Sequence, residues 1–164
     1  MGINRNTISY QPIGIIHSPF KESKGTPIQP VASPNSKATV EIFDEYVGGL
    51  TDIEGFSHLI LIFHMHLTKE SSLKVIPFLD TVEHGVFATR SPGRPNPIGF
   101  SVVQLEKVNG NIFYISGIDI IDGTPLLDIK PFVPAFDVRK ANKIGWFEMK
   151  DIEIATTKDD GRFC

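Results

Sequence analysis

The sequence predicts a mainly β protein, folded as a small closed or nearly closed β-barrel with few short helices. The chain of 164 residues contains 12 prolines and 14 glycines, and these punctuate it throughout. Between them lie short runs rich in Ile, Val, Phe and Thr, of the length that strands usually have. Many evenly spaced strands with little helical periodicity favour a barrel or sandwich over a doubly wound sheet.

Eight runs satisfy the strand criteria, and several alternate between apolar and polar side chains with a period of two residues. The expected strands are Ile13–His17, Ala38–Phe43, His58–His66, Gly85–Thr89, Gly99–Val108, Ile112–Ile118, Leu126–Lys130 and Lys150–Ala155. Asn109-Gly110 is the strongest hairpin signal, and it predicts that 99–108 and 111–118 are antiparallel neighbours.

Helical signals are few. Asp44 is a candidate N-cap for a short helix that ends at Leu50, and Ser71–Leu79 is a second candidate that Pro77 would shorten. No G-x-G-x-x-G turn occurs in the chain, so a Rossmann fold is not expected.

The length predicts one domain, over 10–156, with loose ends at 1–9 and 157–164. The net charge of −3 does not indicate a protein that holds nucleic acid by charge alone. No apolar run is long enough to cross a membrane, and residues 1–10 do not have the pattern of a secretory signal. The single cysteine, Cys164, gives no sign of an oxidising compartment, so we expect a cytoplasmic protein without a membrane partner.

The segment from Gly85 to Gly99 combines a strand-like run with a loop that holds three prolines. Proline stiffens a loop without ladder hydrogen bonds. Such a loop can present Arg90, Arg94 and Asn96 at fixed angles to a carboxylate, a phosphate or a base edge. The alternative is a stiff surface turn whose arginines pair with local acids.

Three other segments contain polar residues that could form a site. Asp122–Pro125 has the composition of a turn, and the side chains of Asp128 and Lys130 share one face of a strand. A hairpin turn with an ion pair explains both equally well. Pro27–Pro30 encloses a glutamine between two prolines and is uninformative alone.

His64 and His66 point to one side of an apolar strand, where they could bind a metal ion with His84 or an aspartate. The sequence offers no complete ligand set, so no metal site is predicted. A structural or substrate-contacting role for this pair is the favoured alternative.

Taken together, these motifs resemble the TsaA-like (TrmO) family. The matching blocks, which span most of the chain, are Pro12–Phe20, Pro27–Pro30, Gly55–Leu59, Gly85–Gly99 and Asp119–Pro134. The resemblance implies a small β-barrel that binds S-adenosyl-L-methionine without a Rossmann sheet, typically as a homodimer. It also implies methylation of the N6 nitrogen of threonylcarbamoyl-adenosine next to the anticodon of tRNA, which would be a transient partner.

The resemblance further implies a set of site residues. Those expected to bind the cofactor are Gln29, Pro30, His66, Leu67, Arg90, Phe100, Ile121, Asp122, Gly123, Thr124 and Pro125. The candidate catalytic bases are Asp122, Asp128 and His66, and the candidate acceptor contacts are Arg94, Asn96 and Lys130.

Three other functions stay open from the sequence. A barrel of this kind could bind S-adenosyl-L-methionine without turnover. It could methylate a small molecule, because the chain is acidic and largely lacks the C-terminal extension of the bacterial tRNA enzymes. It could also be a metal-dependent hydrolase that uses His64, His66 and His84.

Overall fold

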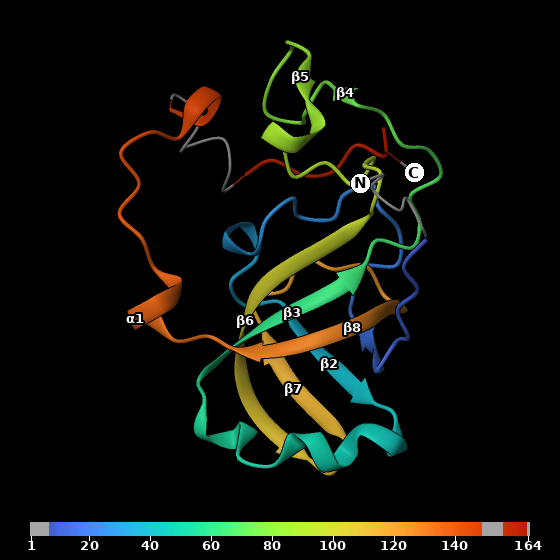
Figure 1. Cartoon of the computed structure of the whole chain (residues 1–164), viewed down its shortest axis with the longest axis vertical. Coiled ribbons are helices and arrows are strands. Elements are labelled where there is room, and N and C mark those ends of the chain that lie inside the picture. The colour runs from blue at the N-terminus through green and yellow to red at the C-terminus, as the bar shows by residue number, and fades with distance from the viewer. Residues whose placement is uncertain (1–6, 149–155, 164) are drawn as a thin grey trace, which may run out of the picture.

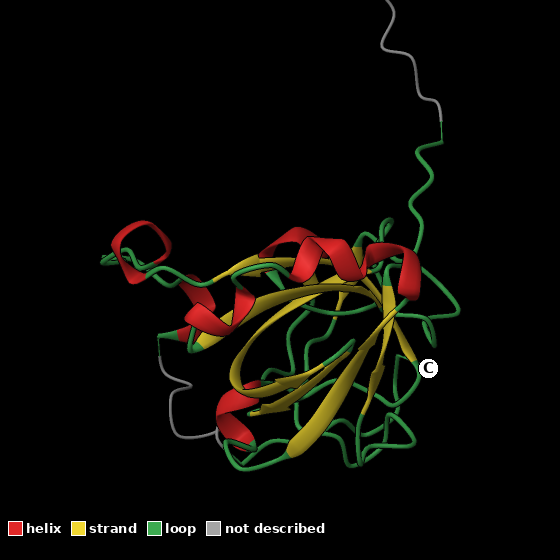
Figure 2. Ribbon diagram, turned by 90° about the horizontal axis from the view of Figure 1, so that it is seen from below, coloured by secondary structure: helices red, strands yellow, loops and turns green. Residues whose placement is uncertain are grey.

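The computed structural model describes residues 7–148 and 156–163. Six antiparallel strands close into a barrel in the order β1-β2-β7-β6-β3-β8 (Figures 1 and 2). The strands are β1 (Gly14–His17), β2 (Lys37–Ile42), β3 (His58–His64), β6 (Ile98–Asn109), β7 (Ile112–Ser116) and β8 (Thr124–Pro131). The predicted mainly β fold with a closed barrel and no Rossmann sheet is confirmed.

The barrel interior is the hydrophobic core, because alternate side chains of each strand point inward. On β3, Leu59 and Leu61 are fully buried, and Phe113 of β7 is the largest of the fully buried side chains. The predicted hairpin is also confirmed. Asn109 pairs with Ile112, and Gly110 takes the positive φ of 61° that this turn needs.

Two expected elements on the long connection between β3 and β6 are wrong. The predicted helix Ser71–Leu79 is instead a loop with a two-residue strand, β4 (Lys74–Val75). The hydroxyl of Ser72 bonds to both the amide and the carbonyl of Lys74, which competes with helical bonding.

The predicted strand Gly85–Thr89 is reduced to β5 (His84–Gly85), followed by a 3₁₀ turn, η4 (Val86–Ala88). Both the hydroxyl of Thr89 and the guanidinium of Arg94 bond to the carbonyl of Val86. Side chains therefore take the acceptors that a strand ladder would use.

The segment after β2 is helical as expected, but it is a 3₁₀ helix, η2 (Asp44–Leu50), and its N-cap is Phe43 rather than Asp44. The amide of Phe43 bonds to the carbonyl of Ile13, so strand pairing continues up to the N-cap and the helix begins directly after it, at Asp44. The expected strand Lys150–Ala155 lies outside the described residues.

The two ends of the barrel differ. The helices η2 and η3 (Ile53–Gly55) lie across one end, whereas the β4–β5 hairpin and several long loops gather at the other (Figure 1). From α1 (Pro134–Asp137) the chain runs along the barrel to η5 (Gly145–Phe147) at this loop end. None of the helices in the described part of the chain has the length and apolarity that crossing a bilayer requires.

The C-terminal segment 156–163 is attached to the barrel, in contrast to the loose end expected for 157–164. Lys158 forms a β-bridge with Pro27, and the amide of Asp159 donates to the carbonyl of Thr26 at 2.8 Å. The amide of Gly25 in turn donates to the carbonyl of Asp159 at 2.7 Å. These bonds join segments that are more than 100 residues apart, which no local sequence signal can indicate.

Candidate functional site

A cleft of about 580 Å³ opens at the loop end of the barrel. Its size falls within the range of about 300–1,000 Å³ typical of small-molecule sites. Segments that are distant in the sequence form its walls, with many apolar and few charged side chains. The expected site residues that line it are Gln29, Pro30, His66, Leu67, Arg90, Arg94, Phe100, Ile121 and Thr124.

Arg90 is held at the cleft wall by two other expected site residues. Its Nη1 donates to Gln29 Oε1 at 2.8 Å, and its guanidinium carbon lies 5.1 Å from the centre of the Phe100 ring. The Arg90 side chain is solvent-exposed, so it retains N–H groups for a ligand in the cleft. A planar fork fixed in this way suits a carboxylate or a phosphate.

Arg94 lines the cleft, and its Nε and Nη2 groups donate hydrogen bonds to the backbone of its own loop. Nε donates to the carbonyl of Ser91 at 2.8 Å, and Nη2 donates to the carbonyls of Thr89 at 2.6 Å and Val86 at 3.3 Å. Arg94 therefore braces its own loop, and its expected contact with the acceptor stays a prediction. Asn96 is exposed and is not among the residues that line the cleft.

His66 lies just after β3, beside the turn that precedes β8. Thr124 Oγ1 donates to the carbonyl of Ile121 at 2.7 Å and lies 3.3 Å from His66 Nδ1, so this nitrogen is placed to donate to the hydroxyl. Burial, and secondarily the neighbouring His64, lower the pKa of His66. Its imidazole is therefore neutral at neutral pH.

Other expected residues lie outside the cleft lining, namely Asp122, Gly123, Pro125, Asp128 and Lys130. Asp122 lines a separate, open hollow, where it pairs with Lys21 Nζ at 2.8 Å and accepts the amide of Ser18 at 2.9 Å. The bond from Lys21 is the main reason that the pKa of Asp122 is lowered. Asp128 and Lys130 pair with each other at 2.7 Å along β8 itself.

Sequence reasoning missed a carboxylate on the cleft wall, Asp119. Ser101 Oγ donates to Asp119 Oδ1 at 2.6 Å, and Ser101 is only 3% exposed. Removal from water raises the pKa of Asp119 to about 6, and the bonds from Ser101 and its own amide, with the charge of Arg90, oppose this shift. The sequence feature that could have identified Asp119 is its position between two isoleucines, Ile118 and Ile120, which are both buried.

An aromatic pair from η5 forms another wall. Trp146 and Phe147 stack with ring centres 3.8 Å apart, and the Trp146 indole donates to the carbonyl of Ala88 at 2.9 Å. The structure shows a 3₁₀ helix whose aromatic rings line the cleft.

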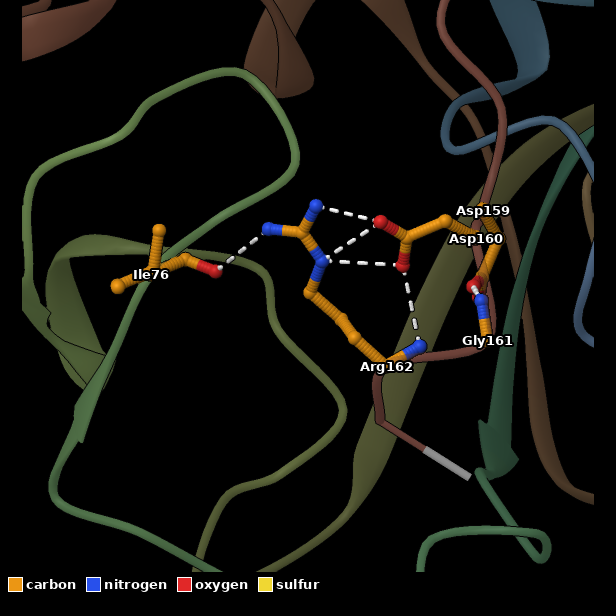
Figure 3. Close-up of polar contacts among 5 residues, drawn as sticks. All are labelled: Ile76, Asp159, Asp160, Gly161 and Arg162. Atoms are coloured by element: carbon orange, nitrogen blue, oxygen red, sulfur yellow. Dashed lines mark hydrogen bonds and ion pairs between the residues drawn. The ribbon is translucent and has the colours of Figure 1, made fainter.

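The C-terminal tail supplies the remaining wall. Arg162 donates hydrogen bonds to Asp160 and to the carbonyl of Ile76 (Figure 3). The distance is 2.9 Å from Nε to Asp160 Oδ2 and 3.4 Å from Nη1 to the Ile76 oxygen. Phe163 packs edge-on against Phe78 at 5.1 Å. This network holds the tail against the loops, so that Asp159 and Phe163 line the cleft.

The histidines do not form a metal centre in the described ranges. Among residues 7–148 and 156–163, no three His, Cys, Asp or Glu side chains gather closely enough to hold a metal ion. His84 instead contacts Asp80 at 3.2 Å and stacks on Trp146 at 4.7 Å. The hydrolase alternative therefore gains no support from this geometry.

The fold and cleft define a small β-barrel protein with a ligand-sized site built from loops. Residues 15–138 match the family model described as the tRNA-methyltransferase O N-terminal domain. The chain belongs to the tRNA-methyltransferase O family, as the sequence motifs predicted.

Relatives and solved structures agree with this assignment. A probable S-adenosyl-L-methionine-binding protein of Pyrococcus abyssi is 57% identical over 95% of this chain and 85% of its own length. The tRNA (adenine(37)-N6)-methyltransferase of Homo sapiens is 42% identical over 77% of this chain, but over only 30% of its own length. The crystal structure of TrmO from Pseudomonas aeruginosa aligns with a TM-score of 0.74 and 38% identity, over 88% of this chain and 63% of the other.

Proposed function

We propose that this protein is an S-adenosyl-L-methionine-dependent methyltransferase that acts on the N6 nitrogen of an adenosine in tRNA. The observation that carries the proposal is the convergence on one cleft of Gln29 with Arg90 and Phe100, which come from a distant part of the chain. The tRNA methyltransferases among the relatives support the reaction, and the S-adenosyl-L-methionine-binding proteins support the cofactor.

The residues present fit the methyl donor. The donor supplies a methyl group on a positively charged sulfur and also has an adenine and an amino-acid carboxylate. The rings of Phe147 and Phe100 line the cleft and suit contact with an adenine, and the Arg90 fork suits a carboxylate. The residues proposed to hold the donor are Gln29, Pro30, His66, Leu67, Arg90, Phe100, Ile121 and Thr124.

More specifically, we propose that the methyl acceptor is threonylcarbamoyl-adenosine next to the anticodon. Its N6 belongs to a urea-like group, whose delocalised lone pair makes it a poor nucleophile. The protein must therefore align this nitrogen with the methyl group and remove its proton. Alignment in a closed cleft can supply several kcal/mol of the barrier, in the range of about 7–11 kcal/mol for ideal cases. A tRNA acceptor also places the protein in the cytoplasm.

The direct test incubates purified protein with tRNA that carries threonylcarbamoyl-adenosine and with isotopically labelled S-adenosyl-L-methionine. Mass spectrometry of the digested nucleosides should show one labelled methyl group on the modified adenosine, and none in unmodified tRNA. Label on unmodified adenosine would retain the reaction class and reject this acceptor. No label in any nucleoside would reject tRNA methylation.

A binding protein without turnover is the second candidate, because several relatives are named only for S-adenosyl-L-methionine binding. The labelling experiment separates the two when it is paired with calorimetry of S-adenosylhomocysteine. Stoichiometric binding without methyl transfer to tRNA or to small-molecule acceptors would favour the binding protein.

We also infer a homodimer in solution. Apolar side chains around the β4–β5 hairpin are strongly exposed, with Phe87 at 80%, Leu73 at 67% and Val82 at 59%. A patch of this kind near a binding cleft is typical of a protein contact, and a two-fold axis would cover it on both subunits. Light scattering should give twice the chain mass of 18.2 kDa. A single-chain mass at all accessible concentrations would contradict the dimer.

A further inference from the structure

The carboxylate of Asp119 has a defined position on the cleft wall. It lies in the connection between β7 and β8, where its neighbours Ile118 and Ile120 are buried in the core. Asp119 and Ile121 line the cleft. Because its neighbours anchor the backbone, this side chain is presented by a rigid part of the barrel rather than by a mobile loop tip.

Ser101 orients the carboxylate. The distance of 2.6 Å from Ser101 Oγ to Asp119 Oδ1 is that of a hydrogen bond to an ionised acceptor. Ser101 is buried on β6, directly after Phe100. Its bond therefore links Asp119 to the part of the cleft wall where Phe100 is proposed to contact the methyl donor. One oxygen of the carboxylate is thus fixed by the protein.

The other candidate bases are less suited to the cleft. Asp122 is ion-paired with Lys21 outside it, and Asp128 is ion-paired with Lys130. Burial lowers the pKa of His66, and its Nδ1 faces the hydroxyl of Thr124. Asp159 lines the cleft, but its side chain accepts the Ser23 hydroxyl and the Gly161 amide, which hold the tail.

We propose that Asp119 is the base that takes the N6 proton during methyl transfer. This proposal rests on the function proposed above. As the bond between N6 and the methyl carbon forms, the carbon–sulfur bond breaks and its electron pair stays on sulfur. The N6 proton moves to the Asp119 carboxylate, which becomes a neutral carboxylic acid and later returns the proton to solvent. The positive charge of the donor and the negative charge of Asp119 are cancelled together.

The electrostatics of the cleft agree with this role. A pKa of about 6 leaves Asp119 mostly ionised at neutral pH, yet makes it a better proton acceptor than an exposed aspartate. Three other charged groups line the cleft with Asp119. They are Arg90, which opposes the upward shift, Arg94, whose Nε and Nη2 are bound to carbonyls, and Asp159, whose carboxylate accepts from Ser23 and Gly161. His66 on the same cleft is neutral at this pH.

The test compares Asp119→Asn with the wild-type protein in the complete reaction with methyl donor and modified tRNA. Asparagine keeps the shape and the acceptor for Ser101 but cannot take a proton. We expect the single-turnover rate to fall by about 10²–10⁴-fold. Affinity for S-adenosylhomocysteine, measured by calorimetry, should change by less than about tenfold. The matched control is Asp44→Asn on η2, at the opposite end of the barrel, and it should retain the wild-type rate.

The pH dependence is a second readout. The wild-type rate should rise about tenfold per pH unit up to about pH 6 and then level off, whereas Asp119→Asn should show no such rise. A readout without activity is thermal unfolding of the ligand-free proteins. The raised pKa means that wild type loses stability relative to Asp119→Asn as pH rises from about 4 to about 6, because only wild type must bury a charge.

Several results would overturn the proposal. They are an Asp119→Asn variant that keeps its rate, a loss of rate matched by an equal loss of S-adenosylhomocysteine affinity, and a wild-type rate that is flat between about pH 5 and pH 8. A flat wild-type profile would overturn the proposal even if the variant does not fold. Wild-type protein that transfers no methyl group would instead reject the proposed function.

Discussion

Replacing Arg90 with alanine is expected to weaken S-adenosylhomocysteine binding by about 10- to 100-fold. A hydrogen bond to a charged group contributes about 1.5–3 kcal/mol, and about 1.4 kcal/mol is a tenfold change in affinity. The substitution removes the fork that Gln29 and Phe100 hold at the cleft wall. Because Arg90 is exposed, the melting temperature should change little. Calorimetry with thermal unfolding as a companion measurement checks both expectations.

Two further variants make this test specific. Arg90→Lys should restore only part of the affinity, because an ammonium group lacks the planar fork. Lys107→Ala removes a cation from the β6 segment that pairs with β7, away from the cleft, and should bind normally. Equal affinities for Arg90→Ala and Lys107→Ala would show that Arg90 belongs to a surface turn without a binding role.

Replacing Arg94 with alanine is expected to destabilise the protein rather than act first on catalysis. The variant loses hydrogen bonds to the carbonyls of Val86, Thr89 and Ser91, all of which are buried residues. The carbonyl of Val86 keeps its bonds from Thr89, but the carbonyls of Thr89 and Ser91 lose the Arg94 donor. An unsatisfied buried acceptor costs about 1–3 kcal/mol, which corresponds to a drop of several degrees in melting temperature, about 2–4 °C for each kcal/mol. The affinity for S-adenosyl-L-methionine should fall as a consequence, because the same loop carries Arg90.

Thermal unfolding of Arg94→Ala beside Asn96→Ala tests this assignment. Asn96 is exposed on the same loop, so its replacement should change stability by less than about 0.5 kcal/mol. Arg94→Lys should rescue poorly, since one ammonium group cannot reach all three carbonyls. An Arg94→Ala variant with normal stability and donor affinity but low turnover would favour the acceptor contact expected from sequence.

The features that were predictable from sequence depend on short-range chemistry. Asn109-Gly110 specifies its hairpin because the turn requires positive φ, and alternating apolar residues on β3 identify a strand with one buried face. The resemblance to a family contributed the site residues around Arg90 that no local pattern singles out. The barrel and part of the cleft lining followed from these two sources.

The unpredicted features depend on contacts between distant segments. The environment of Asp119 comes from Ser101 and Arg90, and only the folded cleft removes its carboxyl from water. The carbonyls that accept from Arg94 have no sequence signature, so the hydrogen bonds from Arg94 to its own loop could not be predicted. The attachment of Asp159 to Thr26 is likewise a product of the folded chain.

A crystal structure of the protein with S-adenosylhomocysteine would show directly whether this cleft binds the methyl donor. We expect one ligand per chain in the cleft at the loop end of the barrel, with Arg90 and Gln29 within hydrogen-bonding distance of it and Phe100 against it. A ligand bound elsewhere, or a cleft that stays empty at saturating ligand, would contradict the assignment of this cleft as the methyl-donor site.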